Sequence, residues 1–139
     1  MKKDAYIIHT DGGARGNPGP AAVGVVVTKN GKPFHQFGKC IGETTNNVAE
    51  YAAVIEALTY LKEQNVRHAN IAFVLDSTLV VNQLNGLFKI KDTRLRELMV
   101  KVMELEAEIG EWVTYESVPR EKNRDADSLV NFYLDGTPR

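Results

Sequence analysis

Four carboxylates in this sequence stand where they could form one metal site. Asp11 follows one apolar run and Asp76 follows another, while Glu50 and Asp127 each lie where a helix is expected to begin. Carboxylates packed together repel one another unless a cation neutralises them. Oxygen ligands favour Mg²⁺ or Mn²⁺ over softer metals, and two such ions about 4 Å apart form the usual clamp for in-line displacement at a phosphodiester.

Each of these residues also has an ordinary structural explanation. An acidic residue in the first turn of a helix is favoured by the helix dipole, which accounts for Glu50 or Asp127 taken singly. An aspartate after a strand, such as Asp76, is commonly a turn or cap residue. A glycine-rich loop such as residues 12–19 is weak evidence by itself. The catalytic interpretation therefore depends on the set of four and on the sequence around each member.

The hydrophobic pattern predicts the elements that must position these side chains. Strands are expected over residues 4–11, 22–29 and 33–42, with Asn30-Gly31 as a hairpin turn. Apolar residues at helical spacing from Val48 predict a helix that ends near residue 64, and Asn47 with Glu50 resembles a capping box. The later elements are expected as a strand over 71–75, a short helix over 78–85 capped by Ser77, a helix over 92–109, a strand over 112–118 and a helix over 125–134.

This order of elements predicts an α/β fold in one domain, residues 1–139. A five-stranded mixed sheet with strand order 3-2-1-4-5 would be flanked by helices on both faces. The change from a meander to crossover connections makes the first and fourth strands neighbours. Asp11 and Asp76 would then meet at carboxyl ends of strands, where sites in such sheets lie.

Composition places the chain among soluble globular proteins. Its 139 residues are 43% hydrophobic and 25% charged, and no apolar stretch is long enough to span a bilayer. A net charge of −1 argues against a simple basic nucleic-acid binder, but not against a nucleic-acid enzyme whose metal neutralises four carboxylates. The lone Cys40 and a start without a signal-peptide core predict a cytoplasmic protein with no internal disulfide. Cys40 and Trp112 are expected to be buried.

The segments around the four carboxylates resemble, in order, the four catalytic blocks of type 1 ribonuclease H. These segments are residues 11–20 (DGGARGNPGP), 44–51 (TTNNVAEY), 76–86 and 118–127. The resemblance covers essentially the whole chain and is nearest to the compact bacterial and archaeal branch. It implies a ribonuclease H-like fold and a metal-dependent endonuclease that cuts the RNA strand of RNA–DNA hybrids, leaving 5′-phosphate and 3′-hydroxyl ends.

The resemblance also implies roles for the carboxylates and a cofactor. Two Mg²⁺ ions per site are expected, with Mn²⁺ as a substitute. Asp11 would bridge both ions, Asp127 would complete the ion that activates water, and Glu50 and Asp76 would hold the ion at the leaving 3′-oxygen. The expected partner is the hybrid alone, bound by a monomer with no membrane and no obligate protein partner.

Small and polar residues near the carboxylates are expected to contact the hybrid. Small residues let a backbone approach the ribose 2′-hydroxyls, by which a protein tells RNA from DNA. Asn side chains would reach base edges. Thr45 would contact a phosphate of the DNA strand. Helix capping is the alternative explanation for the polar members, and both roles can coexist. The expected substrate-binding residues are Gly12, Ala14, Gly16, Asn17, Thr45, Asn46, Asn47, Thr78 and Asn123.

Three features depart from the family pattern. Many members have a histidine about ten residues before the last aspartate, where counting reaches Ser117; Arg120 and Lys122 are the alternatives. Thr78 stands where a longer polar side chain is common. Residues 87–91 lead directly into the next helix, without the basic, Trp-bearing protrusion of some members. A separate hybrid-binding domain before residue 1 is not expected. Weaker hybrid affinity and low processivity are therefore expected.

Three rival functions follow from the same residues. Another nuclease of this fold, such as a transposase, integrase or junction resolvase, is disfavoured by the Gly-Asn-Pro-Gly loop and the Thr-Thr-Asn-Asn block. A non-catalytic hybrid-binding module would be expected to have lost a carboxylate, yet all four are present. A relaxed specificity that includes double-stranded RNA stays open.

Overall fold

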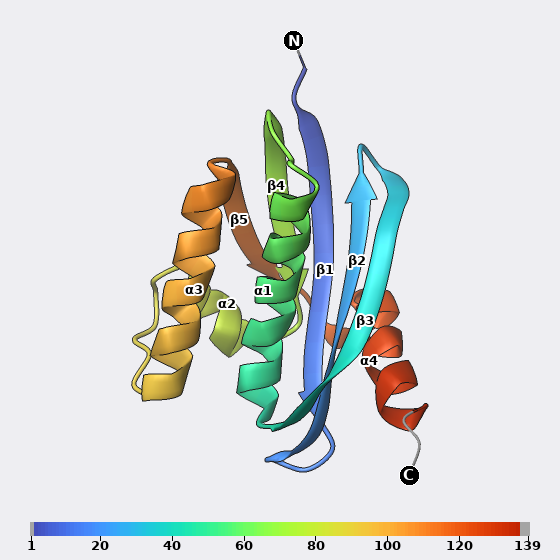
Figure 1. Cartoon of the computed structure of the whole chain (residues 1–139), viewed down its shortest axis with the longest axis vertical. Coiled ribbons are helices and arrows are strands. Elements are labelled where there is room, and N and C mark those ends of the chain that lie inside the picture. The colour runs from blue at the N-terminus through green and yellow to red at the C-terminus, as the bar shows by residue number, and fades with distance from the viewer. Residues whose placement is uncertain (1, 137–139) are drawn as a thin grey trace.

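The chain folds around a mixed five-stranded sheet with strand order β3-β2-β1-β4-β5, which confirms the predicted fold class (Figure 1). The computed structural model describes residues 2–136. The strands are β1 (Asp4–Ala14), β2 (Gly19–Lys29), β3 (Lys32–Thr44), β4 (Ala69–Leu75) and β5 (Trp112–Ser117). The helices are α1 (Asn46–Glu63), α2 (Thr78–Leu84), α3 (Thr93–Ile109) and α4 (Arg124–Asp135), with a 3₁₀ turn η1 (Arg120–Lys122) before the last.

Strand pairing brings the first and fourth strands side by side. β1, β2 and β3 form an antiparallel meander, whereas β4 runs parallel to both β1 and β5. The parallel register pairs His9 with Val74, so Asp11 and Asp76 each follow two residues later on neighbouring segments. β1 does not stop at Asp11 as expected; it continues along β2 to Ala14 after its pairing with β4 has ended.

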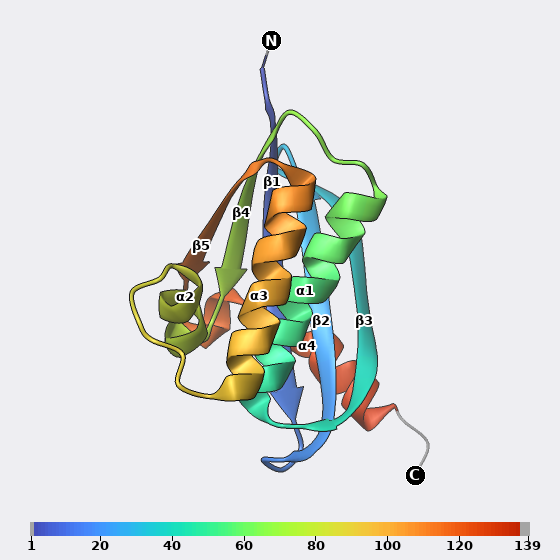
Figure 2. The same ribbon diagram turned by 60° about the vertical axis from the view of Figure 1, so that its left-hand side comes forward.

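The helices form layers on both faces of the sheet. α1 and α3 pack against each other on one face, and α4 lies alone against β1, β2 and β3 on the other (Figures 1 and 2). The larger core lies under α1, where fully buried side chains such as Ile8, Val25, Leu58 and Phe73 exclude water.

Helix α1 begins earlier than the sequence pattern predicts. Its N-cap is Thr45, whose hydroxyl accepts a hydrogen bond from the Val48 N–H at 3.2 Å. The capping box expected for Asn47 is therefore wrong, and Glu50 lies beyond the first turn. The helix dipole falls off within that turn, so it does not explain an acidic residue at position 50.

Two glycines let helices approach the centre of the sheet. A Cβ at Gly12 would lie 2.1 Å from the backbone oxygen of Ala49 in α1, and a Cβ at Gly24 would lie 2.4 Å from the backbone oxygen of Ala126 in α4. Gly24 is the register partner of Asp11. The helices that carry Glu50 and Asp127 are thus seated directly against the strands around Asp11.

Two expectations about buried side chains are wrong. Trp112 is 73% exposed, because it is the first residue of β5, which is an edge strand. Cys40 is also exposed, on the opposite edge strand β3, where its Sγ contacts the Tyr133 carbonyl at 3.3 Å. Across residues 2–136, no helix has the length and apolar character required to cross a membrane.

Candidate active site

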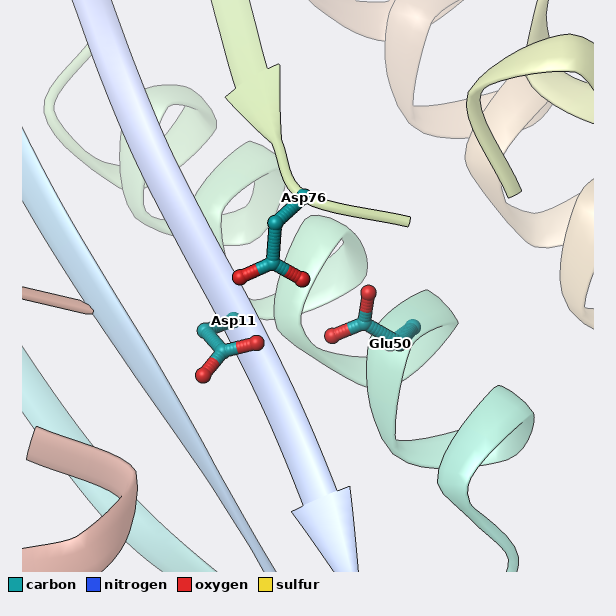
Figure 3. Close-up of side chains that lie close together, drawn as sticks. All are labelled: Asp11, Glu50 and Asp76. Atoms are coloured by element: carbon teal, nitrogen blue, oxygen red, sulfur yellow. The ribbon is translucent and has the colours of Figure 1, made fainter. Parts of the chain in front are cut away.

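Three of the four predicted carboxylates converge at one point of the sheet. Asp11 from β1, Glu50 from α1 and Asp76 after β4 each place a carboxylate oxygen within 4.8 Å of the other two (Figure 3). Asp11 and Glu50 are each only 6% exposed, and Asp76 is half-buried. Burying carboxylates so close together is costly unless a cation compensates their charge.

Neighbouring groups hold two of these carboxylates in place. Glu50 Oε1 accepts a hydrogen bond from the Gly12 backbone N–H at 2.6 Å. Asp76 Oδ2 accepts from Asn123 Nδ2 at 3.3 Å, and the same Nδ2 donates to the Thr10 carbonyl at 2.9 Å. The orientation of each acid is therefore set by the protein.

The electrostatics of the cluster favour protonation when no cation is bound. Burial, followed by the negative charges of Glu50 and Asp76, raises the pKa of Asp11 far above its usual range. Burial also raises the pKa of Glu50, although the Gly12 N–H and the positive charge of Arg120 oppose that shift. A divalent cation at this point would take the place of the protons.

The donor set fits a hard metal ion. Every candidate ligand is a carboxylate oxygen, the type that Mg²⁺ and Mn²⁺ select. Glu50 Oε2 is buried and has no hydrogen-bond partner among the described residues. A buried carboxylate oxygen without a partner is unfavourable, and a bound cation would satisfy it.

Asp127 reaches the cluster from the opposite face of the sheet. It lies in the first turn of α4, as predicted, and lines the same cavity of about 320 Å³ as the other three acids. Its carboxyl group also raises the pKa of Asp11, after burial and the effects of Glu50 and Asp76. Its Oδ2 accepts a hydrogen bond from Asn131 Nδ2 at 3.3 Å.

The glycine-rich loop is tied to the start of α1 by two asparagine side chains. Asn17 Oδ1 accepts from the Asn46 N–H at 3.0 Å, and Asn46 Oδ1 accepts from the Ala14 N–H at 2.9 Å. Both bonds use the amide oxygen, so the amide NH₂ is the group that each side chain offers to a ligand. A second cavity of about 560 Å³, lined by Asn17, Thr45, Asn46 and Asn47 among others, adjoins this loop.

The expected substrate-binding residues divide into three groups. Gly12, Ala14, Asn46 and Asn47 line the carboxylate cavity, and Asn17 and Thr45 line the second one. Gly16 and Thr78 are exposed but line neither cavity.

Asn123 is the exception, since only 1% of it is exposed. Its amide NH₂ donates to the Thr10 carbonyl and to Asp76, so its position is that of a residue that orients Asp76, and a role in substrate contact stays a prediction. The smallness of Gly12 also has a different cause from the one expected, because the space of its missing side chain is occupied by α1 and not left for RNA.

Three polar residues that the pattern did not single out for the site also line the cavity: Arg15, Ser77 and Asn131. Of the three alternatives for the missing histidine, only Arg120 lies there; Lys122 lines a separate cavity with His9, and Ser117 is exposed at the end of β5. Asn131 could have been found from its spacing, because residues four apart on a helix share a face.

Comparison with known proteins gives matches along nearly the whole chain. A family model described as reverse transcriptase-like matches residues 9–133. A ribonuclease HI of Halobacterium salinarum is 42% identical over 127 residues, which are 90% of this chain and 62% of the relative. A bifunctional protein of Mycobacterium tuberculosis is 39% identical over 131 residues, which are 93% of this chain but 35% of the relative. The chain thus spans less than two thirds of the length of these curated relatives.

Solved structures of similar length share the fold. LC11 ribonuclease H1, solved in complex with an RNA/DNA hybrid, is 43% identical with a TM-score of 0.90, and the match covers 94% of this chain and 97% of that one. Ribonuclease H1 of Halobacterium salinarum is 39% identical with a TM-score of 0.89, over 96% of this chain and 99% of that one.

Proposed function

Because the chain belongs to the type 1 ribonuclease H family, we propose that it is an endonuclease that hydrolyses the RNA strand of RNA–DNA hybrids. The products would carry 5′-phosphate and 3′-hydroxyl ends. The observation that carries the proposal is the convergence of Asp11, Glu50 and Asp76, with one buried Glu50 oxygen left unsatisfied. The hybrid bound by the similar LC11 enzyme supports the choice of substrate.

All four carboxylates would hold the metal, with two Mg²⁺ ions per site and Mn²⁺ as a substitute. Asp11 lies beside Glu50 and Asp76 and lines the same cavity as Asp127, which suits a ligand shared by the two ions. Asp127 would complete the coordination of the ion beside the attacking water. Glu50 and Asp76 would help to hold the ion beside the leaving group. Bound divalent ions supply an activated water and stabilise the charge that develops on the 3′-oxygen.

The protein's own polar groups would select and place the RNA strand. The Asn17 amide oxygen is held by the Asn46 N–H and the Asn46 amide oxygen by the Ala14 N–H, so each side chain presents its NH₂ group. We assign Asn46 and Asn47 to base edges of the hybrid and the loop backbone at Ala14 and Gly16 to ribose 2′-hydroxyls. These contacts would distinguish RNA from DNA at the cut strand.

The second cavity is a suitable place for the uncut strand. Thr45 and Asn17 line it, together with Arg94 at the start of α3. Hydroxyl, amide and guanidinium groups are donors to phosphate oxygens. We therefore assign the DNA backbone to this cavity. We assign Thr78, which begins α2 two residues after Asp76, to the flanking part of the hybrid.

Arg120 is proposed as the residue that occupies the place of the family's histidine. Its charge acts on Glu50, and it lines the cavity that holds the carboxylates. An arginine does not titrate near neutral pH, so it would stabilise negative charge on the phosphate and would not carry a proton.

The chain supplies all four carboxylates from one sheet and two helices, so we propose that residues 1–139 act as one ribonuclease H domain and as a monomer. A cytoplasmic location is part of the proposal. It rests on the cysteine content, since the sequence has a single cysteine, Cys40, and its thiol is exposed, which suits a reducing compartment.

The test is cleavage of end-labelled RNA–DNA hybrid, double-stranded RNA and double-stranded DNA in Mg²⁺, Mn²⁺ or EDTA. We expect metal-dependent cleavage of the hybrid's RNA strand, which is lost in Asp11→Asn and Asp76→Asn. Cleavage that persists in EDTA would refute the metal mechanism. Binding of hybrid without cleavage would favour the non-catalytic binding module. Cleavage of double-stranded RNA as fast as of the hybrid would favour the relaxed specificity.

A further inference from the structure

A chain of hydrogen bonds links the glycine-rich loop to Asp127. Arg15 Nη1 pairs with Asp135 Oδ1 at 2.7 Å, and Arg15 Nη2 donates to Asn131 Oδ1 at 3.2 Å. Asn131 Nδ2 then donates to Asp127 Oδ2 at 3.3 Å. Asp127, Asn131 and Asp135 are spaced four residues apart, so they share one face of α4, and Arg15 reaches that face from the loop after β1.

The two ends of the Asn131 amide face groups of opposite charge. Its oxygen, an acceptor, lies against the Arg15 guanidinium, and its NH₂, a donor, lies against the Asp127 carboxylate. If the amide turned over, its oxygen would face a carboxylate and its NH₂ a guanidinium, and both contacts would be repulsive. Arg15 therefore fixes which way the amide points, and Asp135 fixes Arg15.

Asp127 is held less by the core than Glu50 and Asp76 are. Glu50 is held by the Gly12 N–H, and Asp76 by the buried Asn123, whereas Asp127 is a half-buried residue on the rim of the cavity. The Asn131 NH₂, a donor from the same helix, orients Asp127 as Gly12 orients Glu50 and Asn123 orients Asp76.

We propose that Asn131 is a positioning residue that aims Asp127 at the metal site, and that Arg15 sets the orientation of its amide. This inference rests on the proposed function, because it requires Asp127 to be a metal ligand. Partners that orient metal ligands typically change metal affinity or activity by 10- to 100-fold when removed. The hydrogen bonds from Arg15 to Asp127 are exposed to solvent, so we expect their loss to have an effect at the lower end of this range, about 10-fold.

The inference is tested with Asn131→Ala, Arg15→Ala and the double variant, and Ser128→Ala is the control, an exposed side chain on the same helix. Two quantities are measured: Mn²⁺ affinity of the substrate-free protein by isothermal titration, and the Mg²⁺ concentration for half-maximal hybrid cleavage. We expect Asn131→Ala to weaken both by about 10-fold, Arg15→Ala to weaken both by less, and Ser128→Ala to change neither.

The double variant is expected to be no worse than Asn131→Ala, because both residues act through one contact. Additive losses, or a loss confined to the KM for hybrid with unchanged metal dependence, would overturn the proposal and indicate separate substrate contacts. An unchanged Mn²⁺ affinity in Asn131→Ala would overturn it as well. The titration needs no substrate, so a wild-type protein that failed to cleave hybrid would refute the proposed function and leave the test of Asn131 standing.

Discussion

The backbone N–H of Gly12 donates to Glu50 Oε1 across 2.6 Å, so the residue that follows one acid of the site holds the next. The bond forms because α1 lies directly against β1, with the Ala49 carbonyl in the space where a side chain at position 12 would be. Gly12 therefore sets the distance between the strand that carries Asp11 and the helix that carries Glu50.

Gly12→Ala should destabilise the protein and disrupt the site together. The added Cβ would lie 2.1 Å from a backbone oxygen, so α1 has to move away from β1. Overpacking of this kind costs about 3 kcal/mol of the free energy of unfolding, which urea denaturation measures directly. The control is Gly13→Ala, whose Cβ would meet Val130 at an ordinary 3.6 Å; its stability should be unchanged or raised by up to about 1 kcal/mol. Equal losses in both variants would contradict this explanation.

The metal-free protein should lose stability as the pH rises. Burial and the neighbouring acids raise the pKa of Asp11, so above the ordinary carboxyl pKa the folded state keeps a proton that the unfolded state has released. More protons bound in the folded state means that stability falls with pH, by up to about 1.4 kcal/mol per pH unit for each proton. Thermal unfolding in EDTA between pH 5 and 8 measures this slope.

Magnesium should reverse that trend, because the ion replaces the protons. We expect the rise in Tm on adding MgCl₂ to be larger at pH 8 than at pH 6. Asp76→Asn removes one negative charge that acts on Asp11, so the slope in EDTA should become shallower. Glu104→Gln, an exposed change on α3, is the control. A Mg²⁺ effect of the same size at both pH values would exclude linkage to these acids.

The sequence allowed the elements that carry or adjoin all four acids to be predicted, because helices and strands follow periodicity that is local to the chain. Val48 and the apolar residues after it mark α1, and the run before Asp76 marks β4. Crossover connections then restrict the sheet to few arrangements. The convergence of the acids followed from topology and required no knowledge of side-chain contacts.

Contacts between elements that are distant along the chain could not be predicted from the sequence. Gly12 was interpreted as clearance for RNA, but its neighbour is Ala49, 37 positions later. Asn123 was assigned to substrate, but it is buried against Thr10. In both cases the residue type was informative, and its partner depended on packing that no local pattern reports.

Asn123→Ala should act on Asp76 and on stability, and not on hybrid affinity. It removes the donor to Asp76 and leaves the buried Thr10 carbonyl without that partner, which costs about 1–3 kcal/mol. We expect a lower kcat with little change in KM for the hybrid. Asn47→Ala, at the rim of both cavities, is the matched comparison and should raise KM with no loss of stability. A variant at position 123 that is fully stable but binds hybrid weakly would restore the substrate assignment.

Arg120→Ala should reduce the rate of the chemical step, whereas Lys122→Ala should not. Arg120 lines the cavity and its charge acts on Glu50, while Lys122 lines a different cavity beside His9. Loss of a hydrogen-bond donor that is positioned to stabilise developing negative charge typically lowers kcat by about 100-fold or more. Because Arg120 is exposed, we expect its removal to lower kcat by about 10-fold. Single-turnover cleavage of hybrid, measured from pH 6 to 9, separates this from a proton-transfer role. Because a guanidinium does not titrate in this range, its removal should lower the cleavage rate by the same factor at every pH. A rate loss that grows or shrinks around neutral pH would contradict this role and indicate proton transfer.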